Sequence, residues 1–359
     1  MRRELGMSLA LLLMCIALWT SNSDFLGASN VVNTTRQISM LGIFAVGIGF
    51  VIITGGIDLS IGSVVGLTGV IIARLSSTQT GGLGYPLWVG ITVALGAALV
   101  VGLIQGLLIT RLQLQPFIVT LGGMLLFRGV SQTIVDGGVI SMGDSPLLSL
   151  AGGGLLHIGR DPLIGWPLVI FAAVAALGAY VLHYTVLGRY IYAIGGNRDA
   201  ARYSGINVQR VELLTYVISS ATAGIAGVCY AAYIGQMSQQ VGVAYELYAI
   251  AAAVLGGCSL RGGEGTIFGI LIGASIMRVI DNGINMFQIH YTDPDGVGRI
   301  WRLNPNWNWI IVGAVILVAV ILDQVVHAVQ AARRLKEARA RKPIAGPPSS
   351  SPPVPVGPA

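Results

Sequence analysis

Apolar residues occur along this chain in long runs, which short segments rich in glycine, arginine and proline separate. A helix needs about 20 such residues to cross a lipid bilayer, so the pattern predicts an all-α polytopic membrane protein. Polar residues between the runs set the boundaries of the expected helices. The ten predicted spans cover residues 5–20, 39–54, 60–75, 86–109, 116–135, 164–187, 212–235, 244–257, 265–288 and 308–328.

Three of these predicted spans are shorter than a full crossing requires, namely 39–54, 60–75 and 244–257. We expect broken or partial helices there, as in transporters whose helices are interrupted at membrane depth. An alternative model has eight spans, with the second and third, and the eighth and ninth, merged or re-entrant. Both models place the two termini on the same side of the membrane.

Composition agrees with the pattern, because 54% of the 359 residues are hydrophobic and only 10% are charged. Soluble domains carry roughly 25% charged residues, so a soluble globular fold is excluded. Most of the 21 lysines and arginines lie on the side that holds both termini. Basic loops mark the cytoplasmic side, which predicts cytoplasmic N- and C-termini. The net charge of +6 therefore reflects topology, and we expect no nucleic-acid partner.

The sequence predicts one transmembrane permease domain at residues 1–330, with a cytoplasmic loop at 188–208 inside it. A basic segment follows at 331–342, and a Pro/Ser-rich tail, which we expect to be disordered, at 343–359. The only lysines, Lys336 and Lys342, lie outside any G-x-x-x-x-G-K-[ST] motif, so the chain has no P-loop. We expect no enzymatic activity, no metal and no cofactor, and any ATP must bind another subunit.

The loop at 188–208 predicts a short helix on the inner face. Asn197 is a suitable N-cap, Arg198 to Ser204 can form two turns, and Gly205 can end them. Such a basic helix fits a groove on a partner, although a surface helix that only obeys the charge rule has the same pattern. The candidate coupling residues are Asn197, Arg198, Ala201, Arg202, Ser204 and Gly205.

A second candidate lies at 53–69, where two glycines break one span before the next begins. Asp58 or Ser60 can cap the following helix, since a carboxylate is favourable at a helix N-terminus. Ionisable groups at membrane depth are usually functional, which makes Asp58 and Ser60 candidates for a gate or the solute path. Simple capping is the alternative interpretation.

The third candidate is the span at 265–288. Gly265, Gly269 and Gly273 recur every fourth residue, which favours close helix packing. A polar face follows on the same helix, where Arg278 and Asp281 can pair and Glu246 is another possible partner of Arg278. This face either lines a translocation path or clamps helices together. Its members are Arg278, Asp281, Asn282 and Asn285.

Four stretches of the chain resemble the permease subunits of bacterial ABC importers for simple sugars, of the ribose type. They are ITGGIDLSIGSVVGL at 53–67, LQPFIVTLGGMLLFRG at 114–129, GRYIYAIGGNRDAARYSGINV at 188–208, and AAAVLGGCSLRGGEGTIFGILIGASIM at 251–277 followed by DNGINM. Together they extend the resemblance over about residues 40–290. The motifs are shared with a wider superfamily that includes branched-chain amino acid permeases.

The resemblance implies a type II-like ABC importer permease that moves a monosaccharide, a pentose such as ribose, across the bacterial inner membrane. It implies an ABC ATP-binding subunit under the 188–208 loop, a periplasmic sugar-binding protein outside, and a second permease subunit, identical or paralogous. One rival is a permease of the same superfamily for branched-chain amino acids or nucleosides. Arg278 and Asp281 keep that rival open, because a zwitterion needs fixed charges. The other rival is a stand-alone secondary transporter or channel.

Overall fold

The computed structural model describes residues 2–158, 161–292, 298–302 and 306–318, together with positions 304, 320, 321, 324, 325 and 329. The chain divides into a compact unit, Met1–Ile316, and a C-terminal unit, Leu317–Ala359, whose described residues are helical. The predicted basic segment at 331–342 and the Pro/Ser-rich tail at 343–359 lie outside the described residues. The first unit carries every candidate site.

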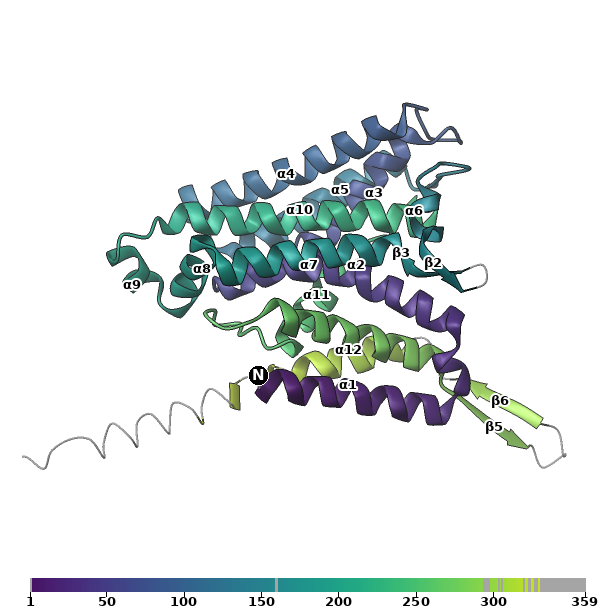
Figure 1. The fold of residues 1–359 in the computed structure, drawn as a ribbon. Coiled ribbons are helices and arrows are strands. Elements are labelled where there is room, and N and C mark those ends of the chain that lie inside the picture. Colours follow the sequence, from purple (N-terminus) through teal and green to yellow (C-terminus); the bar gives the residue numbers. More distant parts are fainter. Residues whose placement is uncertain are drawn as a thin grey trace, which may run out of the picture. The chain divides into compact units, whose positions relative to one another are not determined.

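Seven described helices are long and apolar enough to cross a membrane, which confirms the prediction of an all-α multi-pass membrane protein (Figure 1). They are α1 (Arg2–Ser21), α2 (Ala28–Ile53), α4 (Leu87–Arg111), α5 (Pro116–Val135), α7 (Trp166–Tyr184), α10 (Val208–Ile234) and α12 (Ile267–Met286). Three apolar helices are shorter, namely α3 (Ile61–Ser76), α11 (Tyr245–Leu255) and the described helix Trp307–Val318.

The prediction of a short second span at 39–54 is wrong, because α2 has 26 residues and begins at Ala28. Its first turns are polar and escape a search for apolar runs, yet they are held by hydrogen bonds to other helices. Asn30 and Asn282 exchange two hydrogen bonds, at 3.1 and 2.7 Å. The predictions of short third and eighth helices are confirmed, since α3 has 16 residues and α11 has 11.

The long loops after α5 and α12 contain short strands that the apolar pattern did not predict. A hairpin pairs β2 (Gly154–Ile158) with β3 (Asp161–Gly165), and another pairs β5 (Gln288–Thr292) with β6 (Gly298–Arg302). β1 (Val139–Ser141) pairs with β4 (Gln236–Ser238), which joins the loops after α5 and α10. These strands, with α6 (Leu148–Gly152), lie at one end of the bundle, and α9 (Arg198–Tyr203) lies at the other (Figure 1). We call the latter the α9 end.

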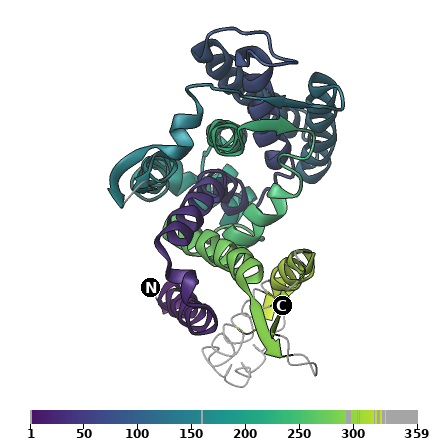
Figure 2. The ribbon, with the colours of Figure 1, turned by 90° about the vertical axis from the view of Figure 1, so that its right-hand side faces the viewer.

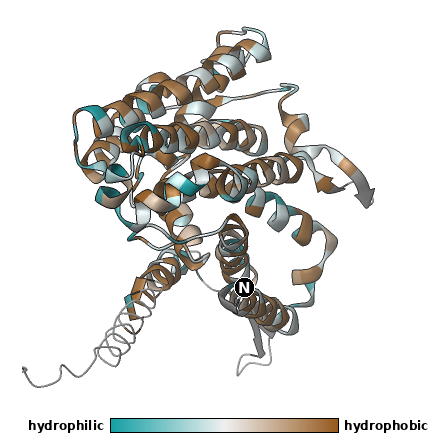
Figure 3. Ribbon diagram, turned by 60° about the vertical axis from the view of Figure 1, so that its left-hand side comes forward, coloured by the Kyte–Doolittle hydropathy of each residue, from teal (hydrophilic) through white to brown (hydrophobic). Residues whose placement is uncertain are grey.

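Helices α2 and α10 form the centre of the bundle, as the view along the helices shows (Figure 2). The second half of α2 is apolar on all sides and buried, as expected for a segment with neighbours all round. α1 instead exposes large apolar side chains, among them Leu5, Leu9, Leu12 and Leu13. Apolar residues predominate along the long helices (Figure 3), as lipid-embedded helices require.

Small residues let α4 approach α10 closely. The buried face of α4 carries a small residue every fourth position, at Gly90, Ala94, Ala98, Gly102 and Gly106. A Cβ at Gly102 would lie 2.8 Å from the Tyr216 carbonyl oxygen, so only glycine permits this backbone contact. The opposite face of α4 exposes Val100, Leu103, Ile104 and Leu107. Lipid tails are as apolar as the helix surfaces, so the hydrophobic effect does not drive helices together in a membrane. Van der Waals packing of small residues drives such contacts instead.

Candidate functional site

The short helix α9 has the local structure that the sequence predicted. The Asn197 side chain accepts a hydrogen bond from the Ala200 amide at 2.9 Å, which caps the helix N-terminus. Ala201 is buried beneath the helix, whereas Arg202 and Ser204 are exposed. Gly205 follows with φ +83°, a conformation that favours glycine. The exposed face of α9 therefore stands at the tip of the bundle.

An ion pair fixes α9 to the start of α10. The Arg198 guanidinium donates to both carboxylate oxygens of Glu212, at 2.7 and 3.1 Å. This two-bond geometry sets direction as well as distance. Arg198 is half exposed, so the pair orients α9 and contributes little stability by itself.

Backbone contacts join α8 (Val186–Gly196) to the end of α2 and to the glycine-rich turn before α12. A Cβ at Gly195 would lie 1.9 Å from the Ile53 carbonyl oxygen, and the Gly263 amide donates to that same oxygen at 2.8 Å. Tyr192 donates to the Gly265 carbonyl at 2.7 Å. Burial raises the pKa of Tyr192 to about 12, so its hydroxyl remains a donor at neutral pH. The segment that carries α9 is thus fixed to the ends of two long helices.

Asp58 lies fully buried between α2 and α3, where it accepts three hydrogen bonds. One carboxylate oxygen receives the Ser60 amide at 2.9 Å and the Ser60 hydroxyl at 2.7 Å. The other receives the Ser219 hydroxyl of α10 at 2.7 Å. The Ser60 hydroxyl also lies 3.1 Å from Gln105 Oε1 on α4. Asp58 therefore ties the break in the chain before α3 to α10 and, through Ser60, to α4.

Arg278 and Asp281 on α12 pair with each other at 2.9 Å. Arg278 also donates to the Tyr230 hydroxyl at 3.1 Å and lies over the Tyr248 ring at 5.3 Å. Arg278 thus has tyrosines as its further partners, where the sequence had suggested Glu246. The cation is thus held by one carboxylate and two tyrosines from α10 and α11.

The two asparagines of the polar face are also bonded within the chain. Asn282 forms its reciprocal pair with Asn30 of α2, and Asn285 donates to the Asp281 carbonyl at 2.9 Å. In this conformation the polar face of α12 connects to α2, α10 and α11. Its predicted role in lining the path stays a prediction.

The glycines of the 265–288 span lie at two kinds of position. Gly265, with φ +149°, precedes α12 and lies in the turn. Gly269 and Gly273 lie on α12, where a Cβ would come within 1.9 Å of the Gly256 and Ala252 carbonyl oxygens. These two glycines allow α12 to lie directly against the C-terminal end of α11.

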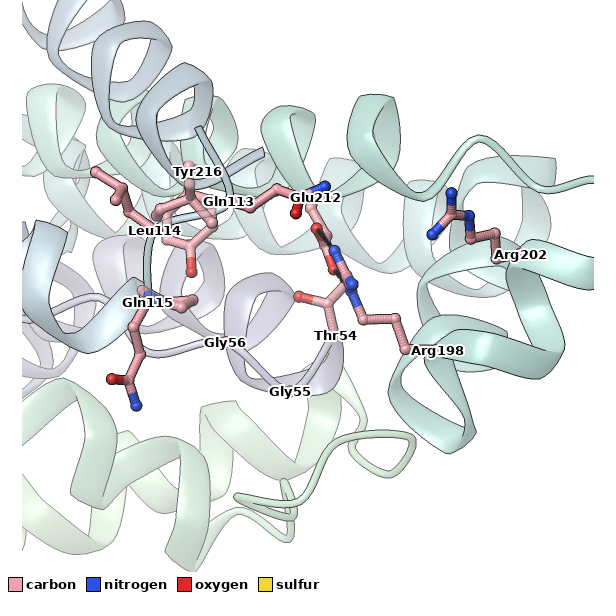
Figure 4. A pocket seen from close by; sticks show the side chains of 12 residues that line it. Thr54, Gly55, Gly56, Gln113, Leu114, Gln115, Arg198, Arg202, Glu212 and Tyr216 are labelled. Atoms are coloured by element: carbon pink, nitrogen blue, oxygen red, sulfur yellow. Dashed lines mark hydrogen bonds and ion pairs between the residues drawn. The ribbon is translucent and has the colours of Figure 1, made fainter. Parts of the chain in front are cut away.

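A cavity of about 470 Å³ opens at the α9 end, and we call it the Tyr216 cavity (Figure 4). Three segments that are distant in sequence surround it: the end of α2, the connection between α4 and α5, and the starts of α9 and α10. It is lined by Thr54, Gly55, Gly56, Ile109, Gln113, Leu114, Gln115, Pro116, Arg198, Arg202, Glu212 and Tyr216. No group of three metal-ligating side chains occurs within the described part of the chain.

Sequence reasoning did not identify several partners that the fold brings to these sites. Ser219, Tyr230 and Glu212 all lie on α10, and Asn30 lies in the polar start of α2. Glu212, Tyr216 and Ser219 are four and three residues apart, which places them on one face of a helix. That spacing was readable in the sequence, but their partners Arg198 and Asp58 come from distant segments.

Comparison with known proteins gives consistent matches. Residues 30–320 match the family model for the branched-chain amino acid transport system permease component. The chain is 38% identical over 315 residues to the ribose import permease protein of Escherichia coli, covering 88% of this chain and 92% of that protein. It is 37% identical over 325 residues to the Bacillus subtilis ribose import permease protein, covering 90% and 93%. The xylose transport system permease protein of Haemophilus influenzae is 33% identical over 359 residues, covering 84% and 91%. No solved structure matches the chain.

Proposed function

Since this chain belongs to the permease-component family of branched-chain amino acid transport systems, we propose that it is the membrane-spanning subunit of an ATP-driven sugar importer. The observation that carries the proposal is the match to ribose import permeases over about nine-tenths of both chains. The xylose permease match extends the same inference to pentoses. The solute is therefore a monosaccharide, and a pentose such as ribose is the first to test.

The structure favours a neutral solute over a zwitterion. A branched-chain amino acid carries a carboxylate and an ammonium group, which need free charges of opposite sign in the path. Arg278 and Asp281 are already paired at 2.9 Å, and tyrosines cover the cation. Releasing this pair inside the membrane would cost several kcal/mol per ion. A sugar, which needs hydroxyl and amide partners, does not require that release.

The proposed assembly places the α9 end in the cytoplasm, with both termini on that side of the inner membrane. Because the chain has no P-loop, an ABC ATP-binding subunit must supply the energy. The exposed face of α9 suits docking on that subunit, since its cap, its buried Ala201 and its bond to Glu212 hold it rigidly. A second permease subunit completes the pathway, and a periplasmic sugar-binding protein delivers the solute at the opposite end. ATP-driven movement of α9 then alternates access to the path.

The test is transport by the complete complex in proteoliposomes. The chain, its candidate ATPase and its binding protein are reconstituted with ATP, and uptake of labelled ribose is measured against labelled leucine and uridine. We expect ATP-dependent ribose uptake that excess unlabelled xylose reduces. Uptake of leucine or uridine instead of ribose would assign the rival superfamily function. Ribose movement without any ATPase would support a stand-alone transporter.

Docking is tested on the exposed face of α9. Replacing Arg202 with glutamate reverses a charge that lies in solvent, so the fold should persist while the ATPase no longer co-purifies. Arg210, exposed near the start of α10, provides the matched charge reversal outside α9. Retention of the ATPase by the Arg202→Glu variant would argue against α9 as the docking helix.

A further inference from the structure

The Tyr216 cavity contains a buried hydroxyl without an acceptor. Tyr216 is only 2% exposed, and its hydroxyl finds no hydrogen-bond acceptor among the described residues. It nevertheless lines the cavity, so a molecule inside could accept this bond (Figure 4). The Ile57 backbone contacts the hydroxyl oxygen, but the hydroxyl proton has no acceptor. Buried donors normally have an acceptor, so a donor without one at a cavity wall points to an occupant.

The rest of the lining matches a small polyhydroxylated molecule. Thr54, Gln113 and Gln115 contribute neutral polar groups, and Ile109, Leu114 and Pro116 contribute apolar surface. The one lining carboxylate, Glu212, is neutralised by Arg198, and the exposed Arg202 lies on α9 rather than beside Tyr216 (Figure 4). Mixed apolar walls with a few polar groups are typical of small-molecule sites, and the volume falls within their usual range.

Glycines at the end of α2 keep the space in front of Tyr216 open. Gly55 turns the chain with φ +83°. A Cβ at Gly56 would lie 2.6 Å from the Tyr216 hydroxyl oxygen and so would crowd that atom. The access to the hydroxyl therefore depends on glycine at position 56.

On the basis of the proposed function, we propose that the Tyr216 cavity binds the imported neutral sugar from the α9 side, and that this occupancy slows import. The cavity wall includes the α10 face that carries Glu212 and Tyr216, and the next residue on that face, Ser219, holds Asp58. An occupant thus contacts Glu212, which holds Arg198 of α9, and it contacts α10, which holds Asp58 before α3 through Ser219. Binding there stabilises one arrangement of these elements, which opposes the cycle of alternating states.

Solute protection of an engineered cysteine tests binding directly. Gln115→Cys places a thiol in the cavity wall, and Leu112→Cys places one on the same connection outside the lining. Both are made with Cys15→Ser, because the other two cysteines are fully buried. The complete complex in inside-out vesicles is labelled with a membrane-impermeant maleimide in the presence of ribose. We expect ribose to slow labelling at position 115 and leave position 112 unchanged.

Tyr216→Phe removes only the hydroxyl and should raise the ribose concentration for half-protection about fivefold to tenfold, as expected for the loss of one hydrogen bond. Tyr203→Phe, which removes an exposed hydroxyl on α9, should leave it unchanged. Ribose preloaded into proteoliposomes whose lumen faces the α9 side should slow ATP-driven uptake in the wild type, and less so in Tyr216→Phe.

Ribose uptake by the same complexes separates the two proposals. Uptake without protection at position 115 would overturn the cavity inference and leave the proposed function standing. Protection by ribose 5-phosphate but not by ribose would overturn the assignment of a neutral ligand. If ribose protects position 115 equally well in Tyr216→Phe, the hydroxyl does not bind the sugar, and the proposed site is wrong. Absence of ribose uptake in the wild-type complex would overturn the proposed function, and the inference with it.

Discussion

Asp58 offers the sharpest test of how the break before α3 is held. Replacing it with alanine leaves the Ser219 hydroxyl and the Ser60 amide without their acceptor in a fully buried position. The Ser60 hydroxyl can still turn to Gln105. Each orphaned buried donor costs about 1–3 kcal/mol, so we expect Asp58→Ala to destabilise the fold by about 2–6 kcal/mol.

Asp58→Asn should cost much less, about 0–2 kcal/mol, because the amide oxygen can keep the Ser60 bonds and the amide nitrogen can donate to Ser219. The comparison separates loss of hydrogen-bond partners from loss of charge. If the negative charge itself were the stabilising feature, the asparagine and alanine variants would be equally affected.

Thermal unfolding of the purified full chain in detergent measures the difference. Cys229 and Cys258 are fully buried, so a thiol-reactive fluorophore reports their exposure as the helices separate. At about 2–4 °C per kcal/mol, the destabilisation of about 2–6 kcal/mol should lower the transition of Asp58→Ala by roughly 4–24 °C. Asp24→Ala, at an exposed carboxylate, is the control. An Asp58→Ala transition equal to that of the control would refute the reasoning.

Three further outcomes follow from the helix contacts. Gly273→Ala should destabilise by about 1–3 kcal/mol, because its Cβ would meet a carbonyl oxygen of α11, whereas Gly96→Ala, in open space, should be neutral in the same unfolding assay. Asn282→Leu should remove the donor to Asn30 Oδ1 and destabilise the fold, and adding Asn30→Leu should restore part of the loss. A lower uptake with unchanged unfolding would instead favour a path role. Arg198→Ala should lower the free energy of unfolding by less than about 1 kcal/mol, because the Arg198 side chain is half exposed. A larger loss would mean that α9 supports the fold.

The candidate sites share one physical feature: most of their buried charged atoms are satisfied by partners from other parts of the chain. Asp58 has three donors, and Arg278 has a carboxylate and two tyrosines. Unsatisfied polar groups are costly at membrane depth. The Tyr216 hydroxyl departs from this rule at a cavity wall, which is why it carries the inference of a ligand.

The local elements were determined by the sequence because their causes are local. Apolar runs placed the long helices, since a span must be apolar along its own length. Asn197 and Gly205 defined α9, because caps act within one turn. The i, i+3 spacing of Arg278 and Asp281 predicted their pair, which the structure confirms. The extent of α2 was misjudged because its polar first turns depend on bonds to distant residues.

Only the tertiary structure decided which segments meet. Gly265 belongs to the packing stripe that the sequence predicted, but in the fold it lies in the turn before α12 and its carbonyl accepts from Tyr192. The Gly263 amide in the same turn donates to the Ile53 carbonyl. Asp58 reads as a cap or a gate, and the fold adds Ser219, 161 residues away. The Tyr216 cavity exists only where three separate segments converge. Hydrogen bonds and cavities between helices depend on packing geometry, which no single apolar run or local motif contains.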